Sequence, residues 1–461
     1  MTHPRSLLRG CALLLLCWLT GAGAAERPLN FIVMLVDDMG ATDLGCTGST
    51  FYKTPHLDQL AREGVQFTRA FSACTVCSPT RAALLTGKYP ARLHITDWIA
   101  GHARPNAKLL PPDWCQSLPA AETTLPEMLK TKSYATATFG KWHLGNESPT
   151  AHGFDVNKGG YHRGQPETWF SPYKNPAITD GPPGEFLTAR LTAEAEQFMT
   201  QHREAPFLIY FPHYAVHTPL GGEKEVIAKY RAAAKADAPQ RNPVYASMVE
   251  SVDDSVGRLR AKLVELKLAE RTVFIFTSDN GGLRGGAKQP ITANLGLRAG
   301  KGSAYEGGVR VPLLIHWPGV SKAGTRCAEP VITMDLCATI AAGSELNAPE
   351  DGRDIRPLLR GESIPPRPLH WHYPHYHPGG ATPYSALLYD GWRLIRFYED
   401  GHAELYHVAK DPEETKDLAA ANPGKRDQLS DVLDAWLKKT GAQLPVANPR
   451  HDAAKDRAAG Q

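Results

Sequence analysis

The sequence has little net charge and no apolar run long enough to cross a membrane. Its 461 residues include 51 Lys and Arg against 48 Asp and Glu, a difference of 51 − 48 = 3. This balance provides no basic surface of the kind that binds nucleic acid, so we expect no nucleic-acid partner. The run at 11–19 is too short for a bilayer core that needs about 20 residues, and no second run is longer, so we expect no membrane span.

The N-terminus has the features of an export signal. Arg5 and Arg9 flank the start of the apolar run, and Ala22-Gly23-Ala24 offers the small residues of a cleavage site. A retained membrane anchor is the alternative, but the run is short for one. We therefore expect residues 1–25 to be a signal peptide and the protein to be periplasmic or secreted. The sequence does not distinguish these two locations.

Cysteine is too sparse for a disulfide framework. Two of the eight cysteines lie in the predicted signal, and export would permit the other six to pair. Cys74 and Cys77 form a Cys-x-x-Cys pair, which is typical of a disulfide, a redox motif or half of a zinc site. The sequence has no second such pair to complete a zinc site.

Alternating strand and helix patterns predict an α/β protein. Hydrophobic residues make up 42% of the chain and charged residues 21%, as in ordinary globular proteins. Near-continuous apolar runs predict buried strands at 30–36, 134–139, 207–211, 272–277 and 311–316. Apolar stripes at helical spacing lie between them, at 187–198 and 248–266. This order predicts a mostly parallel sheet flanked by helices.

The character of the chain changes near residue 363. A proline-rich stretch at 364–368 precedes shorter strand-like pieces and a final helical pattern at 429–437. We therefore expect a large N-terminal catalytic domain at 26–362 and a smaller C-terminal α+β subdomain at 363–446. The remaining residues, 447–461, form a polar tail that we expect to be disordered.

Polar clusters follow four of the predicted strands, and ligands bind at the carboxyl ends of parallel strands. The clusters are Asp37-Asp38, the stretch 140–143, His213 with His217, and 278–282. We expect them to meet on one rim of the sheet. Oxygen ligands suit Ca²⁺ or Mg²⁺ better than Zn²⁺, and the candidate ligands are Asp37, Asp38, Asp279 and Asn280. The alternative is that these residues only cap strand ends or form turns.

The segment from Cys77 to Gly87 predicts a helix with an anion site at its start. Pro79 suits the first helical turn, and Gly87 suits the C-terminal cap. Cys77 would lie beside the free N–H groups and the positive end of the helix dipole. Arg81 adds a planar fork that can bind a tetrahedral oxyanion.

Cys77-Ser78-Pro79-Thr80-Arg81, followed by Thr86-Gly87, resembles the signature of the formylglycine-dependent (type I) sulfatases. The resemblance covers about 28–440. Within it, the segments 97–109 and 370–377 resemble bacterial carbohydrate sulfatases more than lysosomal arylsulfatases. It implies an alkaline-phosphatase-like fold and a sulfuric ester hydrolase. A formylglycine-generating maturation enzyme would oxidise Cys77 to Cα-formylglycine. One calcium ion (Ca²⁺) per chain would be held by residue 77 and the four oxygen-bearing residues named above.

The resemblance also implies roles for the basic residues. Arg81 and Lys141 would stabilise the hydrated aldehyde, and His143 would be its base. His217 and Lys301 would contact sulfate, with His217 the proton donor to the leaving oxygen. One hydroxyl of the hydrate would form a sulfate ester, and the other would then expel sulfate by C–O cleavage. Taken singly, each of these residues also fits a surface lysine or a packed histidine.

Two polar, aromatic segments, 97–109 and 370–377, are candidates for binding a sulfated saccharide substrate. From them we expect Arg104, His372 and His375 to contact sugar. A structural aromatic cluster or adventitious metal binding is the alternative for the histidine run. By analogy with bacterial enzymes, our hypothesis for the substrate is galactose or N-acetylgalactosamine 4-sulfate.

Other functions stay open at this point. A formylglycine phosphonate monoesterase or phosphodiesterase would share the nucleophile and the metal. A two-zinc alkaline phosphatase fits less well, because Cys77-Ser78-Pro79-Thr80-Arg81 has no role there. A catalytically silent protein that binds sulfated glycans would result if Cys77 were never modified.

Overall fold

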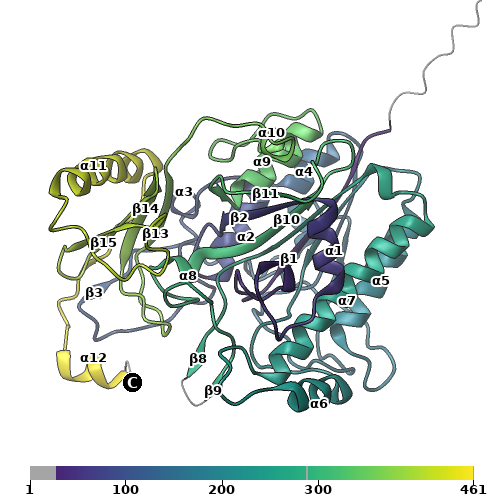
Figure 1. Ribbon diagram of the computed structural model, residues 1–461, viewed down its shortest axis with the longest axis horizontal. Helices are drawn as coiled ribbons and strands as arrows, with labels where there is room; N and C mark the ends of the chain where they lie inside the picture. Colours follow the sequence, from purple (N-terminus) through teal and green to yellow (C-terminus); the bar gives the residue numbers. More distant parts are fainter. Residues whose placement is uncertain (1–26, 287–288, 460–461) are drawn as a thin grey trace, which may run out of the picture.

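The computed structural model describes residues 27–286 and 289–459, which form a large sheet with helices on both faces and a smaller sheet beside it (Figure 1). The predicted signal peptide lies outside the described residues. The larger sheet has nine strands, in the order β11-β2-β10-β7-β1-β6-β4-β5, with β12 beside β2. These strands are β1 (Asn30–Val36), β2 (Val65–Phe71), β4 (Ala135–Phe139), β5 (Val156–Lys158), β6 (Phe207–Pro212), β7 (Thr272–Ser278), β10 (Arg310–His316), β11 (Thr325–Cys327) and β12 (Val331–Ile332).

The centre of this sheet is parallel, as the sequence predicts. Strand β1 pairs in parallel with both β6 and β7, and β4 pairs in parallel with β6. Strand β10 is the exception, since it runs antiparallel to β7 and β2. The fold is therefore the expected mostly parallel α/β fold, with one reversed strand inside the sheet.

The side chains of β1 alternate between two apolar cores, which explains why the whole strand is apolar. Ile32 and Met34 face a core shared with α1, α5 and α7, whereas Phe31 and Val33 face a core shared with α2, α4, α9 and α10. The helices of this part are α1 (Pro55–Glu63), α2 (Cys77–Thr86), α3 (Pro90–Leu93), α4 (Leu125–Lys130), α5 (Leu187–Gln201), α6 (Lys224–Ala233), α7 (Pro243–Glu265), α8 (Glu306–Val309), α9 (Met334–Gly343) and α10 (Arg356–Leu359).

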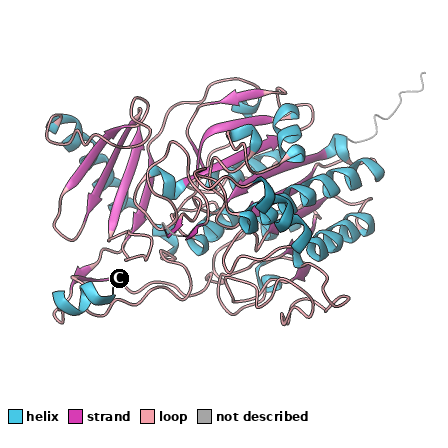
Figure 2. Ribbon diagram, turned by 60° about the horizontal axis from the view of Figure 1, so that its bottom comes forward, coloured by secondary structure: helices cyan, strands magenta, loops and turns pink. Residues whose placement is uncertain are grey.

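The second sheet lies to one side of the first (Figure 2). It is antiparallel, in the order β13-β14-β15-β16, and α11 packs against it. Its elements are β13 (Leu369–Tyr373), β14 (Tyr384–Tyr389), β15 (Trp392–Phe397), β16 (Ala403–His407) and α11 (Pro423–Thr440). The predicted C-terminal α+β part is thus present.

The polar tail, which we expected to be disordered, contains secondary structure as far as residue 459. Its strand β17 (Val446–Ala447) pairs with β3 (Leu109–Leu110), and it ends in α12 (Ala453–Ala459). The amide of Asn448 donates to the carbonyls of Pro105, at 3.0 Å, and Ala107, at 2.7 Å. Long-range hydrogen bonds of this kind carry no sequence pattern, which is why composition alone predicts disorder.

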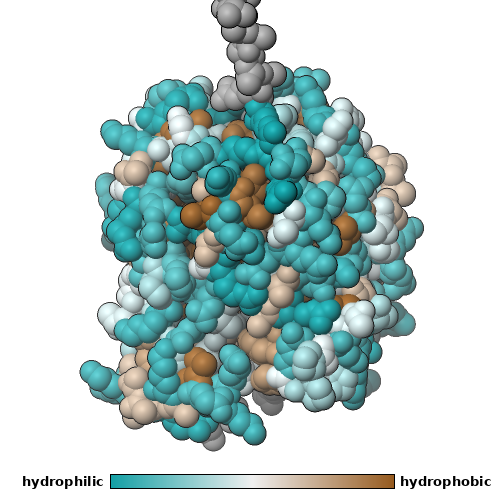
Figure 3. Space-filling model, turned by 90° about the vertical axis from the view of Figure 1, so that its right-hand side faces the viewer, coloured by the Kyte–Doolittle hydropathy of each residue, from teal (hydrophilic) through white to brown (hydrophobic). Residues whose placement is uncertain are grey.

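The surface in Figure 3 is mostly hydrophilic, with small apolar patches of the size that soluble domains usually expose. No helix in residues 27–286 and 289–459 combines the length and the hydropathy needed to cross a bilayer. A small hairpin of β8 (Gly285–Gly286) and β9 (Gln289–Pro290) projects near α6 (Figure 1).

Candidate active site

Four neighbouring strands of the large sheet end beside one another and carry the polar clusters. The register pairs Val36 of β1 with Ser278 of β7, so Asp37 and Asp279 leave the sheet at the same level. Lys141 and His143 follow β4, and His217 follows β6. The strand order β7-β1-β6-β4 therefore brings together residues that lie far apart in the sequence.

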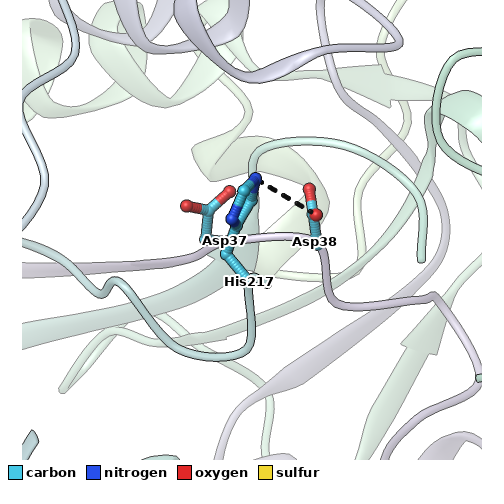
Figure 4. A group of neighbouring side chains, drawn as sticks. All are labelled: Asp37, Asp38 and His217. Carbon is cyan, nitrogen blue, oxygen red and sulfur yellow. Dashed lines mark ion pairs between the residues drawn. The ribbon is translucent and has the colours of Figure 1, made fainter. Parts of the chain in front are cut away.

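A buried acidic group lies at this rim. Figure 4 shows Asp37 and Asp38 on either side of His217, and ligand atoms of the three residues lie within 4.8 Å of one another. Asn280 donates its amide N–H to Asp38 Oδ1 at 2.8 Å. Asp279 Oδ1 accepts from the backbone N–H of Asp38 at 3.2 Å. The predicted oxygen ligands thus form one connected cluster.

Each carboxylate of this cluster has its own buried cation. Lys141 Nζ lies 2.6 Å from Asp37 Oδ2, and Lys301 Nζ lies 2.7 Å from Asp38 Oδ1. Arg81 donates to Asp279 Oδ2 from both Nε, at 3.0 Å, and Nη2, at 2.7 Å. Opposite charges in contact offset the large desolvation cost of burying ions. Arg81 Nη2 also lies 3.6 Å from Asp37 Oδ2, so three buried cations together compensate the three carboxylates.

The compensation leaves two oxygen atoms unused. Asp37 Oδ1 and Asn280 Oδ1 are buried, and neither has a hydrogen-bond partner among the described residues. An unpaired buried acceptor costs about 1–3 kcal/mol. Burial and the nearby charge of Asp279 also raise the pKa of Asp37 above its usual value, so added positive charge would favour its ionised form. This all-oxygen donor set fits a hard divalent cation such as Ca²⁺.

Cys77 is the first residue of α2, and its side chain is buried at the edge of this cluster. The helix ends at Gly87, whose φ of 68° is left-handed, as predicted for a glycine cap. Cys74 and Cys77 are both free thiols, so this pair is no disulfide. Burial raises the pKa of the Cys77 thiol, which therefore stays protonated and is a weak nucleophile.

The ring of His143 lies between residue 77 and the carbonyl of Ile99. Its Nε2 faces the carbonyl of Ile99 and must carry a proton to make that hydrogen bond. The free lone pair is then on Nδ1, which lies 3.3 Å from Cys77 Sγ. Burial and the neighbouring Lys141 hold the pKa of His143 well below its usual value, so the ring is neutral.

Two of these residues have unusual backbone conformations. Asp38 has a φ of 61° and His143 a φ of 56°, both in the left-handed region. For non-glycine residues such conformations cost about 1–3 kcal/mol and concentrate at functional sites.

A cavity of about 290 Å³ opens above the cluster, and Cys77, His143, His217 and Lys301 all line it. Burial and Lys301 lower the pKa of His217 to about 3, so this ring is neutral without a bound anion. Trp98 and His377 also line the cavity, although we did not single them out from the sequence. Both lie within the two segments that we expected to contact sugar, 97–109 and 370–377. The sequence indicated these segments but not these two residues.

The three side chains expected to contact sugar do not line this cavity. His372 is 4% exposed, and its ring nitrogens contact Ser385 Oγ at 2.7 Å and the Gln443 carbonyl at 2.9 Å. His375 is 2% exposed and contacts Thr96 Oγ1, and Arg104 pairs with Asp456 in the tail. Strand β13 is buried along its whole length, so its histidines pack within the core.

Comparison with known proteins agrees with this geometry. A family model described as "Sulfatase" matches residues 29–343, which is more than half of the chain. The chain belongs to the sulfatase family. It is therefore a sulfuric ester hydrolase. A second model, for the C-terminal region of N-sulphoglucosamine sulphohydrolase, matches residues 300–442.

Curated sulfatases are similar to the chain over most of its length. A sulfatase of Formosa agariphila is 31% identical, covering 95% of this chain and 95% of its own. The N-acetylgalactosamine-6-sulfatase of Homo sapiens is 33% identical, covering 92% of this chain and 88% of its own.

Solved structures share the fold. That of Ps i-CgsB has a TM-score of 0.76 and 26% identity, covering 94% of this chain and 98% of its own. The phosphonate monoester hydrolase of Agrobacterium radiobacter, at 18% identity, has a TM-score of 0.65 with 91% and 99% coverage and shares the fold alone. The alkaline-phosphatase-like fold expected from the sequence is confirmed.

We predict that Arg81→Met destabilises the protein strongly. The change leaves the buried Asp279 carboxylate without its two hydrogen bonds, and breaking a buried ion pair costs about 3–5 kcal/mol. Thermal unfolding of the variant should show a clearly lower midpoint. The matched control is Arg360→Met, which removes a solvent-exposed pair with Glu362 and should change the midpoint little. Equal effects of the two changes would contradict the importance of the buried cluster.

Proposed function

We propose that this sulfatase removes sulfate from a sulfated sugar, with Cys77 matured to Cα-formylglycine and Ca²⁺ bound beside it. The observation that carries this proposal is the position of residue 77. Its side chain lines the same cavity as His217 and Lys301, and it borders the buried cluster with two unused oxygens. A nucleophile, an anion-binding pair and a cation site thus meet at one point.

The metal ligands in this proposal are Asp37, Asp38, Asp279 and Asn280, with the modified residue 77. A bound Ca²⁺ supplies positive charge that offsets the repulsion between an anionic sulfate ester and an oxygen nucleophile. The hydrated aldehyde supplies two hydroxyl groups, one to attack sulfur and one to release the product. An unmodified cysteine lacks the second hydroxyl, and here its thiol is also protonated.

The other residues divide the remaining work. His143 Nδ1 accepts the proton of the hydroxyl on residue 77, because this nitrogen faces the side chain. Lys301 holds sulfate oxygens, and His217 donates a proton to the leaving sugar oxygen. An anion bound in the cavity favours the protonated form of His217. Arg81 and Lys141, which lie beneath the cavity, stabilise charge that develops on the oxygens of residue 77.

The substrate class is supported by what similar proteins act on or bind. One curated relative is an N-acetylgalactosamine-6-sulfatase, and Ps i-CgsB was crystallised in complex with k-i-k-neocarrahexaose. We propose a sulfated galactose or N-acetylgalactosamine as the substrate, with the 4-sulfate as the ester predicted from the sequence. The proposal includes export through residues 1–25 and maturation by a formylglycine-generating enzyme.

Replacement of Cys77 tests the nucleophile. We expect Cys77→Ala to lower sulfatase activity about a thousandfold or more, because the nucleophile itself is lost. Cys74→Ala is the matched control, since Cys74 is also a buried free thiol but does not line the cavity, and it should stay active. Both variants and the wild type are produced together with a formylglycine-generating enzyme.

Mass spectrometry of the tryptic peptide 70–81 completes this test. The wild-type peptide should have lost the sulfur of Cys77 and two hydrogens and gained one oxygen, as the aldehyde requires. Full activity of Cys77→Ala would disprove the mechanism. An intact cysteine together with retained glycan affinity would instead support a silent binding protein.

A panel of sulfated sugars tests the predicted position of the sulfate ester. We expect sulfate release from galactose or N-acetylgalactosamine 4-sulfate, measured as inorganic sulfate. Release from the 6-sulfate or 2-sulfate alone would disprove the 4-sulfate assignment while leaving the sulfatase mechanism intact. Faster turnover of a phosphonate monoester than of any sulfate would favour the phosphorus-centred alternative.

A further inference from the structure

The cavity at Cys77 adjoins two other cavities, because it shares lining residues with each of them. On one side it shares Ile99, Gly164 and Gln165 with a cavity of about 470 Å³. On the other side it shares Leu283, Lys301 and His377 with a cavity of about 750 Å³. We call the three together the trough. Residue 77 therefore lines the cavity that adjoins both of the others, so the hollow surface available to a substrate extends beyond the central cavity.

The trough has a one-sided charge. It is lined by Arg163, Arg284 and Lys301, and no Asp or Glu is among its lining residues in the described parts of the chain. The whole chain has nearly equal numbers of acidic and basic residues, 48 and 51, so the excess of basic residues is a feature of the trough. A separate cavity between the two sheets, by contrast, mixes arginines with Glu329 and Asp335. A cleft lined by cations alone attracts anions along its length.

The two arginines of the trough differ in what they contact. Arg163 already pairs with Glu167. The guanidinium of Arg284 is exposed and has no hydrogen bond or ion pair among the described residues. Its backbone is fixed, because its carbonyl accepts from the N–H of Ile291 at 2.8 Å. Arg284 is thus an exposed cation whose backbone is hydrogen-bonded and whose guanidinium has no partner within residues 27–286 and 289–459.

Arg284 also lies beside the chain segment that carries Lys301. A β-carbon placed on Gly300 would be 3.0 Å from Cγ of Arg284, so the stem of this arginine passes beside Gly300, the residue before Lys301. Lys301 faces the central cavity, whereas Arg284 lines only the larger side cavity. The two cations can therefore bind two different anionic groups of one substrate.

We propose that the trough binds a glycan chain with several sulfates through its interior, so that the scissile ester is on an internal sugar. Arg284 pairs with the sulfate of the neighbouring sugar, through charge-assisted hydrogen bonds. This inference rests on the proposed sulfatase function and extends it from a single sulfated sugar to a polyanionic chain. A blind pocket would admit only a chain end, whereas a trough open on both sides admits internal units.

Defined oligosaccharides of increasing length, each with one sulfate per sugar, test this inference against a small aryl sulfate. We expect kcat/KM of the wild type to rise with chain length, and sulfate to be lost from internal sugars as well as from the ends. Arg284→Gln should lower kcat/KM on the oligosaccharide about tenfold more than on the aryl sulfate, the effect of one charge-assisted contact. It should also weaken the dependence of oligosaccharide turnover on salt.

The matched control is Arg231→Gln, an exposed arginine on α6 that lines none of the three cavities. This change should leave kcat/KM on both substrates, and the salt dependence of turnover, as in the wild type. Sulfate release from chain ends alone, or an equal effect of Arg284→Gln on both substrates, would overturn the inference. Absence of sulfate release by the matured wild type from every substrate, the aryl sulfate and the oligosaccharides alike, would instead overturn the proposed function on which the inference rests.

Discussion

The active site depends on the pairing of three buried carboxylates with three buried cations. Asp37, Asp38 and Asp279 follow two adjacent strands, and without compensation their charges would repel one another in a medium of low polarity. Each contacts a cation from a different part of the chain: Lys141 after β4, Lys301 before α8, and Arg81 in α2. The chain must therefore fold completely before the cluster is stable, which ties the site to the topology of the sheet.

The same cluster connects the fold to the chemistry. The parallel strands β7, β1, β6 and β4 end at one edge, and this edge carries the acids, the bases and the start of α2. The left-handed backbones of Asp38 and His143 place their side chains where a regular strand extension would not. These two conformations reduce the free energy of unfolding, and they occur at residues that contact residue 77 or belong to the oxygen cluster. The trough adjoins this edge of the sheet. Its basic side chains favour an anionic substrate, as the proposed sulfate site does.

Much of this arrangement was predictable from the sequence. Continuous apolar runs revealed β1, β4, β6, β7 and β10, because strands buried on both faces leave no polar positions. Strand β2 was not predicted, because Gln66, Thr68 and Arg69 interrupt its apolar pattern. The contacts of His372 and His375 were not predictable, because aromatic and histidine-rich runs suit a packed core as well as a sugar site. The order in the tail was also missed, since it depends on hydrogen bonds to a distant loop.

A crystal structure of the matured protein grown with Ca²⁺ tests the central claim most directly. We predict one anomalous-scattering peak at the cluster, about 2.3–2.6 Å from Asp37 Oδ1 and Asn280 Oδ1, the two oxygens of the cluster that have no hydrogen-bond partner among the described residues. Absence of a peak at saturating calcium, or a peak that neither of these two atoms contacts, would contradict the account.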